Sequence, residues 1–334
     1  MTLPKVFLLG ATGYLGSSLL PTLEAYANRR EISLKIGVRS TSAKPINTQA
    51  EIVALNYDRV EQLASQFTGT DVIISALKVT PDNIQIHNNV ALAASNANVK
   101  SYIPSEFGTD PRATKYHHTV FDLKFNHKKY VQSLGLKTIS VYTSLFLELA
   151  SNTLLDIKDG NSNWNIVGKS SDLLSLTSLV DLGHILARIV IIINENPNDI
   201  PSDIRVYSDT RSYDEYASIV KSTLGREINI KTENIQEVEK RYNDGISNPI
   251  ESFFTVLKLI SSEHAFDFSK DNVRDFINPN EKYFRLTKFD VLKWITLNFN
   301  FLKFWYLFIR FLCIHIETIT FRKIKCAITS FPFS

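Results

Sequence analysis

The stretch KVFLLGATGYLG, residues 5–16, decides the predicted fold. An apolar run of strand length ends at Gly10, and a segment with leucines at helical spacing starts at Tyr14. Gly10, Gly13 and Gly16 lie between and within these segments at GxxGxxG spacing. In a strand–turn–helix unit, such glycines permit a tight turn, backbone approach to a pyrophosphate and close packing of helix on strand. We therefore predict dinucleotide binding here rather than a glycine-rich turn without a ligand.

The first half of the chain alternates apolar strand-like segments with segments that favour helix. The predicted strands are 5–10, 34–40, 51–56, 71–77, 101–105 and 137–146, and the predicted helices include 14–28, 85–97 and 120–134. Nearly continuous apolar strands that alternate with helices are typical of a parallel sheet covered on both faces. Pro21 lies inside the first helix and is expected to remove a backbone hydrogen bond or to kink it.

After residue 146 the alternation loosens. We predict a capped apolar helix at 178–193 with Asp181 near its start, a polar connection at 194–203, a strand at 204–209, a helix at 212–225 and a strand at 226–232. The predicted fold class is therefore α/β. It consists of a Rossmann-type, doubly wound parallel sheet (1–150), with a smaller C-terminal substrate lobe (151–290) interleaved with it.

The second predicted strand ends in Val38-Arg39-Ser40, where many dinucleotide-binding proteins carry an acid that binds the ribose 2′-hydroxyl. This segment has no acid, and Lys44 follows Arg39 five residues later. A guanidinium suits a 2′-phosphate, so the sequence favours NADPH over NADH. The alternative is an arginine that is simply solvated at the surface.

The stretch YIPSEFGTDP, residues 102–111, follows the next-to-last predicted strand of the sheet, where catalytic groups gather in such folds. A typical short-chain dehydrogenase would supply a Tyr-x-x-x-Lys pair, and no tyrosine of this chain has lysine four positions later. Lys124, on the helix after the turn, is the best-placed alternative, since a lysine in a half-dry pocket loses its proton more readily. Its other interpretation is a solvated helix lysine, which is what we expect of Lys128 and Lys129.

Several motifs together resemble the isoflavone reductase-like branch of the NmrA-like, atypical short-chain dehydrogenase family, from about residue 4 to about residue 290. They are GATGYLG (10–16), Arg39, YIPSEFGTDP (102–111), VFDLK (120–124) and SYDEYASIVKSTLGREI (212–228). Within this branch, which also includes pinoresinol reductases, the chain resembles the phenylcoumaran benzylic ether reductase type and is expected to be a fungal-type member.

The resemblance implies an NADPH-dependent reductase that transfers hydride to a small aromatic or conjugated substrate, with Lys124 as general base. It also implies cofactor contacts, which we extend to the ends of the fourth and fifth strands; Glu106 is expected to hold the turn. The predicted cofactor-binding residues are Gly10, Thr12, Gly13, Tyr14, Leu15, Gly16, Arg39, Lys44, Ala76, Ser105 and Phe107. The alternative from another class is an NmrA-like regulator that senses dinucleotide without turnover; a lysine at 124 favours the enzyme.

Other signals are weaker. GKS at 168–170 lacks the leading glycine of a phosphate-binding loop, because Asn163 stands in its place. His117, His118 and His127 have no acids at ligand spacing, so we expect surface or pocket-rim residues and no metal site.

The charge of the chain is unevenly distributed. Residues 291–334 hold six of the 37 basic and one of the 34 acidic side chains, which leaves 31 basic and 33 acidic side chains in the first 290 residues. This balance gives no support to nucleic-acid binding.

Residues 291–334 differ in composition from the rest: they are apolar and basic and contain both cysteines. Lys303, Arg310 and Glu317 interrupt the apolar run, so a membrane-spanning helix is not expected. The segment is an amphipathic membrane-surface helix, a core or dimer-forming helix, or a misannotated gene end, and the composition shift favours the last. Detection of a 300–334 peptide from the native protein by mass spectrometry would contradict it.

The start of the chain enters a strand at once, so we expect a cytoplasmic protein, with membrane contact only if this tail is genuine. The sequence does not decide between a monomer and a homodimer.

Overall fold

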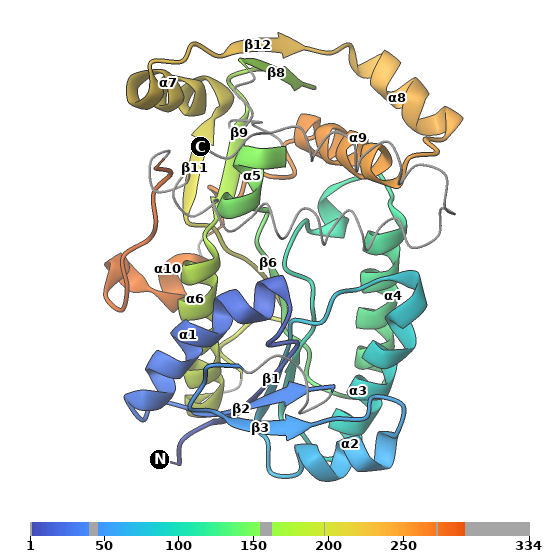
Figure 1. Ribbon diagram of the computed structural model, residues 1–334, viewed down its shortest axis with the longest axis vertical. Coiled ribbons are helices and arrows are strands. Elements are labelled where there is room, and N and C mark those ends of the chain that lie inside the picture. The colour runs from blue at the N-terminus through green and yellow to red at the C-terminus, as the bar shows by residue number, and fades with distance from the viewer. Residues whose placement is uncertain (1, 40–45, 154–161, 197, 272, 291–334) are drawn as a thin grey trace, which may run out of the picture.

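The computed structural model describes residues 2–39, 46–153, 162–196, 198–271 and 273–290, and the predictions for Lys44 and for 291–334 lie outside them. Its central sheet is parallel throughout, with the strand order β3-β2-β1-β4-β5 (Figure 1). The strands are β1 (Lys5–Leu9), β2 (Ser33–Val38), β3 (Glu51–Ala54), β4 (Val72–Ser75) and β5 (Ser101–Ile103). This order confirms the predicted Rossmann-type α/β fold.

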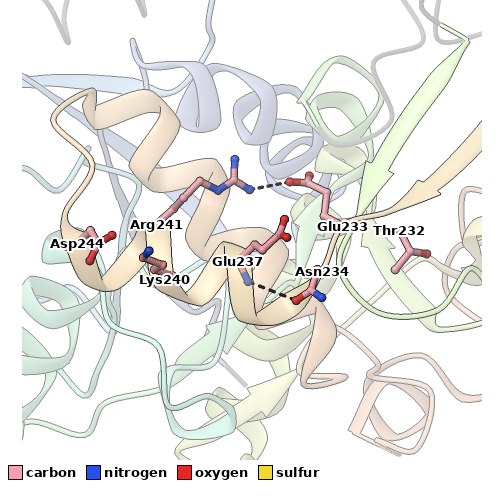
Figure 2. A pocket seen from close by; sticks show the side chains of 7 residues that line it. All are labelled: Thr232, Glu233, Asn234, Glu237, Lys240, Arg241 and Asp244. Atoms are coloured by element: carbon pink, nitrogen blue, oxygen red, sulfur yellow. Dashed lines mark hydrogen bonds and ion pairs between the residues drawn. The ribbon is translucent and has the colours of Figure 1, made fainter.

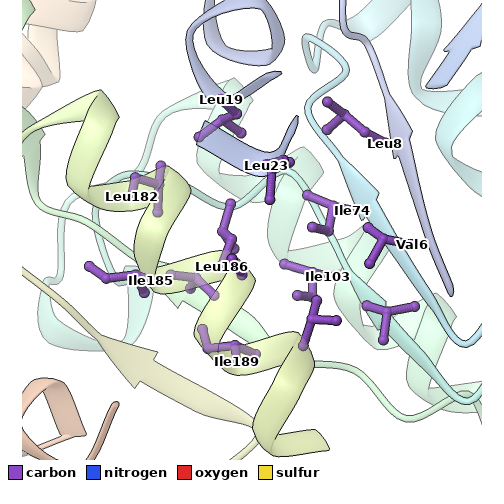
Figure 3. Packing of buried hydrophobic residues seen from close by; sticks show 14 of the residues in the cluster. Val6, Leu8, Leu19, Leu23, Ile74, Ile103, Leu182, Ile185, Leu186 and Ile189 are labelled. Atoms are coloured by element: carbon purple, nitrogen blue, oxygen red, sulfur yellow. The ribbon is translucent and has the colours of Figure 1, made fainter. Parts of the chain in front are cut away.

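Helices cover both faces of this sheet. α1 (Tyr14–Asn28) and α6 (Leu179–Glu195) lie on one face; α2 (Val60–Phe67), α3 (Ile84–Asn96) and α4 (Thr119–Ser133) lie on the other. Strand β1 supplies both cores because successive side chains point to opposite faces. Val6 and Leu8 pack with α1 and α6, as Figure 3 shows, and Phe7 and Leu9 pack with α2 and α3.

Helix α1 continues through Pro21 as far as Asn28. Proline removes one backbone hydrogen bond, and the burial of Leu19, Leu20 and Leu23 against α6 and the sheet compensates for it. Helix α6 belongs to the second half of the sequence but completes a face of the first domain. The chain therefore crosses between the two parts.

Two predicted strands are each divided in the structure. The segment 137–146 forms β6 (Ser140–Tyr142) and β7 (Leu145–Phe146), separated by Ser144 with φ of 54°. The segment 204–209 contributes to β10 (Asp203–Arg205) and β11 (Asp209–Ser212). β6 pairs with β10 in parallel, and an isolated bridge from Tyr102 to Thr138 joins this pair to β5. The breaks allow the chain to leave the central sheet and enter the second lobe.

The second lobe has its own apolar core, which includes Trp164, Tyr213, Tyr216 and Phe266. Its elements are β8 (Asn163–Ile166), β9 (Leu173–Thr177), α7 (Tyr213–Leu224), β12 (Asn229–Thr232), α8 (Ile235–Asp244) and α9 (Pro249–Ser262). Sequence reasoning predicted α7 and β12 but missed β8, β9, α8 and α9. Short elements are α5 (Leu147–Thr153), α10 (Val273–Ile277), η1 (Pro81–Asn83), η2 (Pro111–Ala113) and η3 (Pro279–Glu281). Within the described ranges, no helix is long and apolar enough to cross a membrane.

Candidate functional site

The glycine loop joins β1 to α1 at the carboxyl end of the sheet, and two of its glycines are sterically required. Gly10 has φ of +80°, and a Cβ there would lie 2.7 Å from the carbonyl carbon and oxygen of Ala76. A Cβ at Gly16 would lie 2.1 Å from the carbonyl oxygen of Gly10. Neither distance is possible for a side-chain carbon, so only glycine lets α1 and β4 approach the loop this closely.

The amino end of α1 has the features of an anion site. Gly13 is the N-cap and, like Thr12, is exposed, while Tyr14 and Leu15 are half-buried. In the described chain, no side chain caps this helix. The N–H groups of the first turn have no acceptor within the helix and carry its positive dipole end. Such uncapped N–H groups at a helix N-terminus are suited to a phosphate group. Among the described residues, a Cβ at Gly13 would meet only the carbonyl oxygen of Gly10, at 3.3 Å.

The remaining predicted cofactor residues lie at the same end of the sheet or next to it. Ala76 follows β4, and its N–H donates to the carbonyl of Leu9 at 2.9 Å. Phe107 is buried and Ser105 half-buried just after β5. Arg39 is exposed just after β2. Burial raises the pKa of the Tyr57 hydroxyl to about 12, and the positive charge of Arg39 opposes this rise. These positions suit the adenosine and nicotinamide ends of an extended dinucleotide.

Lys124 contacts the turn that connects β5 to α4. Its Nζ donates a hydrogen bond of 2.6 Å to the backbone carbonyl of Glu106. Ser105 and Phe107 are the sequence neighbours of Glu106, so the amine lies on the segment that carries these two predicted cofactor residues. Burial lowers the pKa of Lys124, and the negative charge of Glu106 opposes this effect. The half-buried lysine is thus held on the turn and loses its proton more readily than a solvated lysine would.

Backbone groups, rather than the Glu106 carboxylate, account for the hydrogen bonds of the turn. The N–H of Glu106 donates to the carbonyl of Pro104 at 2.8 Å, and the N–H groups of Thr143 and Ser144 donate to the carbonyl of Gly108. The Glu106 side chain is 2% exposed, and its Oε1 has no hydrogen-bond partner among the described residues. The expectation that Glu106 holds the turn is therefore wrong for its carboxylate. Burial raises the pKa of this group.

Lys128 corrects another expectation, because it is buried rather than solvated. It forms an ion pair with Asp203 and donates to the Tyr142 hydroxyl at 3.3 Å. Arg112 also pairs with Asp203, at 3.0 Å. One helical turn after Lys124, α4 is thus fixed to β6 and β10, since a buried lysine requires a paired carboxylate.

Asp110 extends this ionic cluster into the turn. Its carboxylate has no exposed surface and accepts hydrogen bonds from Arg112 at 2.8 Å and from Arg205 at 3.0 Å. Burial alone would raise the pKa of Asp110, but the hydrogen bonds from the two guanidinium groups lower it below its ordinary value. Sequence reasoning did not identify this cluster. GTDP marked a turn, but no spacing connects Asp110 to residues 203 and 205.

The three histidines do not behave alike. His127 is buried, contrary to expectation, with Nδ1 2.9 Å from the Asn88 Oδ1, and burial lowers its pKa to about 3. The ring of His118 caps α4 by accepting from the N–H of Val120, and His117 is exposed. In the part of the chain that the structure describes, no group of three or more His, Cys, Asp or Glu side chains could hold a metal ion.

The GKS segment lies in a turn between β8 and β9 that no helix follows, and the N–H of Lys169 donates to Asp172. This is not the strand–loop–helix context of a phosphate-binding loop.

A hollow of about 760 Å³ lies in the second lobe along α8 (Figure 2). Two contacts link residues that line it: Arg241 contacts Glu233 at 2.6 Å, and Asn234 accepts from the N–H of Glu237. Figure 1 shows α8 at the opposite end of the molecule from β1, β2 and β3. This hollow is therefore not part of the glycine-loop site.

The sheet order and the glycine loop at the end of β1 define an α/β protein of the Rossmann class. The chain belongs to the NmrA-like family, which matches residues 3–285.

The chain is similar to the oxidoreductase aprR of Aspergillus flavus, with 30% identity over 185 residues, which are 54% of this chain and 61% of that protein. It is 28% identical to pinoresinol reductase 1 of Arabidopsis thaliana over 156 residues, covering 42% of this chain and 49% of the relative. The chain thus spans about half to three fifths of the length of these relatives.

The fold is also similar to the solved structure of AtPrR2 with NADP+ and (+)pinoresinol. The TM-score is 0.67 at 17% identity, covering 85% of this chain and 96% of that chain.

Proposed function

We propose that the protein is an NADPH-dependent reductase that transfers hydride to a small aromatic or conjugated molecule, with Lys124 as the general base. One observation carries the proposal: the Lys124 amine is held 2.6 Å from the carbonyl of Glu106, beside Ser105 and Phe107 at the carboxyl end of the sheet. The similarity to pinoresinol reductase 1 supports the substrate class. When bound, the dinucleotide would supply the hydride.

The residues of this chain have three separate tasks in the proposal. The N–H groups at the start of α1 bind the diphosphate, Gly13 lets it approach the backbone, and Gly10 and Gly16 allow the close packing of the loop. Ser105 and Phe107 orient the nicotinamide end. Lys124 accepts or returns a phenolic or enolic proton of the substrate, for which burial has already lowered its pKa.

Turnover tests the role of Lys124. NADPH oxidation is followed with a panel of phenolic ethers, enones and quinones for the wild type, Lys124→Ala and Lys129→Ala. Lys129 is an exposed lysine on the same helix and serves as the matched control. We expect Lys124→Ala to lower kcat by at least about 100-fold, a typical contribution of a general base, with NADPH affinity nearly unchanged. Equal kcat in Lys124→Ala and the wild type would exclude this role.

Arg39 is proposed to bind the 2′-phosphate that distinguishes NADPH from NADH. It is exposed just after β2, where no acid stands. Arg39→Asp should weaken NADPH binding by at least about 10-fold while changing NADH binding much less, since one charge-assisted pair is lost. Lys240→Asp, the same charge reversal on α8, is the control for net charge. An unchanged NADPH-to-NADH ratio of Kd values in Arg39→Asp would reject the assignment.

A regulator that binds dinucleotide without turnover would give a different pattern in the same assays. It would bind NADPH through the glycine loop and Arg39 but oxidise it with no substrate of the panel. Lys124→Ala would then leave every measured property unchanged. The buried position and lowered pKa of Lys124 favour the enzyme, because a sensor needs no base there.

A further inference from the structure

Glu106 is a buried acid whose carboxylate has no evident structural role. It is 2% exposed, and its Oε1 has no hydrogen-bond partner among the described residues. A buried carboxylate oxygen without a hydrogen-bond partner destabilises a protein, and such groups remain mainly where function requires them. The position therefore calls for a functional explanation.

The charged and titratable groups around Glu106 come from five elements. Lys124 and Lys128 face it from α4, Asp203 from β10, Tyr142 from β6 and Tyr102 from β5, and Asp110 belongs to its own turn. Lys128 already has Asp203 as its partner, and Asp110 is bound by Arg112 and Arg205. Lys124 is thus the one lysine next to Glu106 that has no ion pair within the described residues.

The contact between Lys124 and residue 106 is to the backbone carbonyl and not to the carboxylate. The hydrogen bond to this carbonyl fixes the amine at 2.6 Å, while the charge of the side chain acts from a greater distance. On the other side, His87 of α3 is buried, and its imidazole interacts electrostatically with Lys124. Its Nε2 lies 3.1 Å from the carbonyl of Lys78, and burial keeps the ring neutral by lowering its pKa.

We propose that Glu106 is a positioning residue for Lys124: its carbonyl fixes the amine, and its carboxylate sets the pH at which the amine releases a proton. The inference rests on the proposed function in taking Lys124 as the proton-handling group. A carboxylate near the amine stabilises the ammonium form, so it opposes the burial that would make Lys124 too acidic. The two effects together would place the pH at which Lys124 releases its proton between the pH for a fully desolvated lysine and the pH for a solvated lysine.

The test measures the proton release of Lys124 without relying on turnover. Competitive acetylation over a range of pH, with quantification of the Lys124 peptide by mass spectrometry, reports the fraction of free amine. In Glu106→Gln, which keeps the shape and removes the charge, we expect the midpoint for Lys124 to fall by about one pH unit. Glu106→Asp keeps the charge, and its midpoint should remain near that of the wild type.

The exposed pair of Lys221 and Glu227, 2.8 Å apart in the second lobe, provides the matched control. In Glu227→Gln, which removes an exposed and solvent-screened charge, the midpoint of the Lys124 peptide should not change. An unchanged Lys124 midpoint in folded Glu106→Gln would overturn the proposal. So would equal shifts in Glu106→Gln and Glu106→Asp, because these would point to a change of structure rather than of charge.

Kinetics separate this proposal from the proposed function. If Lys124 is the base, the acid limb of the kcat profile should move to lower pH in Glu106→Gln, by the same interval as the labelling midpoint. If Lys124→Ala retains full turnover, the proposed function fails, while the labelling result still decides whether Glu106 governs the proton of Lys124. A labelling shift with no movement of the acid limb would mean that Glu106 tunes a lysine that is not the base.

Discussion

The glycine loop (residues 10–16) and the turn after β5 (residues 104–113) lie at the same end of the parallel sheet but are built in opposite ways. The loop depends on the absence of side chains: Gly10 and Gly16 leave no room for a Cβ. The turn depends on buried charge: Asp110 is fully enclosed by the chain and bound by Arg112 and Arg205. The comparison shows that the same end of a sheet can combine a loop whose shape depends on glycine backbone with a turn whose shape depends on buried, paired charges.

The largest effect is expected from removing the central acid of the turn. Asp110→Ala would leave Arg112 and Arg205 without their shared carboxylate, and breaking a buried ion pair in this way costs about 4 kcal/mol. Unfolding in urea checks the value. Asp110→Asn, which keeps part of the hydrogen bonding, should lose less, and a loss as small as that of a surface substitution would show that the cluster does not stabilise the turn.

Acid should remove the same contribution, because the pKa of Asp110 is lowered in the folded protein. A carboxyl with a lowered pKa stabilises the fold above its ordinary value of 3.8, and this stability is lost as the pH falls below that value. The wild type and Asp110→Ala should therefore converge in stability toward low pH. Parallel curves would contradict the assignment.

Gly16→Ala should have the next largest effect, and it tests the loop. The Cβ of an alanine at position 16 would lie 2.1 Å from the carbonyl oxygen of Gly10, so the loop or α1 must move. Severe overpacking of this kind costs about 3 kcal/mol of stability. NADPH affinity should fall together with the urea midpoint. The control is Gly225→Ala at the end of α7, where φ is positive but a Cβ meets nothing within 4 Å, with an expected cost of about 1 kcal/mol.

The smallest effect near neutral pH is expected at His127 on α4, because its contribution appears only as the pH falls below 6.5. Its pKa is lowered to about 3 by burial, so the unfolded chain takes up a proton below pH 6.5 that the folded protein refuses. Stability should thus decline as the pH falls from 6.5 toward 3, by at most about 1.4 kcal/mol per pH unit for this single group. His127→Gln should flatten this decline, measured as Tm against pH. The exposed His117→Gln is the control, and an equal slope in both would contradict the prediction.

The sequence predicted the central fold well because its signals are local. The strand ending at Gly10, the glycine spacing and the apolar alternation all act within a few residues, and the sheet order follows from parallel crossover units. The end of α7 at Gly225 was likewise predicted, since a glycine just after the last helical residue is a recognised helix signal. The second lobe was predicted less completely: β8 and β9 are only 4 and 5 residues long, and strands that short give little periodicity.

The site was predicted as a set of positions but not as an environment. The chain alone indicated the glycine loop, Arg39 and Lys124. It also suggested that Lys128 is solvated, that His127 lies at the surface or at a pocket rim, and that the Glu106 side chain holds the turn. The structure shows Lys128 and His127 buried and the Glu106 Oε1 without a hydrogen-bond partner among the described residues. Burial depends on what packs against a side chain, and the partners of Lys128 lie 14 and 75 residues away.

The sequence by itself therefore determined the Rossmann class, the glycine loop and the residue types available for chemistry, because glycine sterics and strand–helix alternation are encoded locally. Tertiary structure alone decided which charges are buried and which are paired. Lys124 and Lys128 are one turn apart on α4, yet Lys128 pairs with Asp203 while Lys124 contacts only a backbone carbonyl among the described residues. This difference arises because β10 reaches one of them and not the other, and charge pairing across a fold has no local sequence signal.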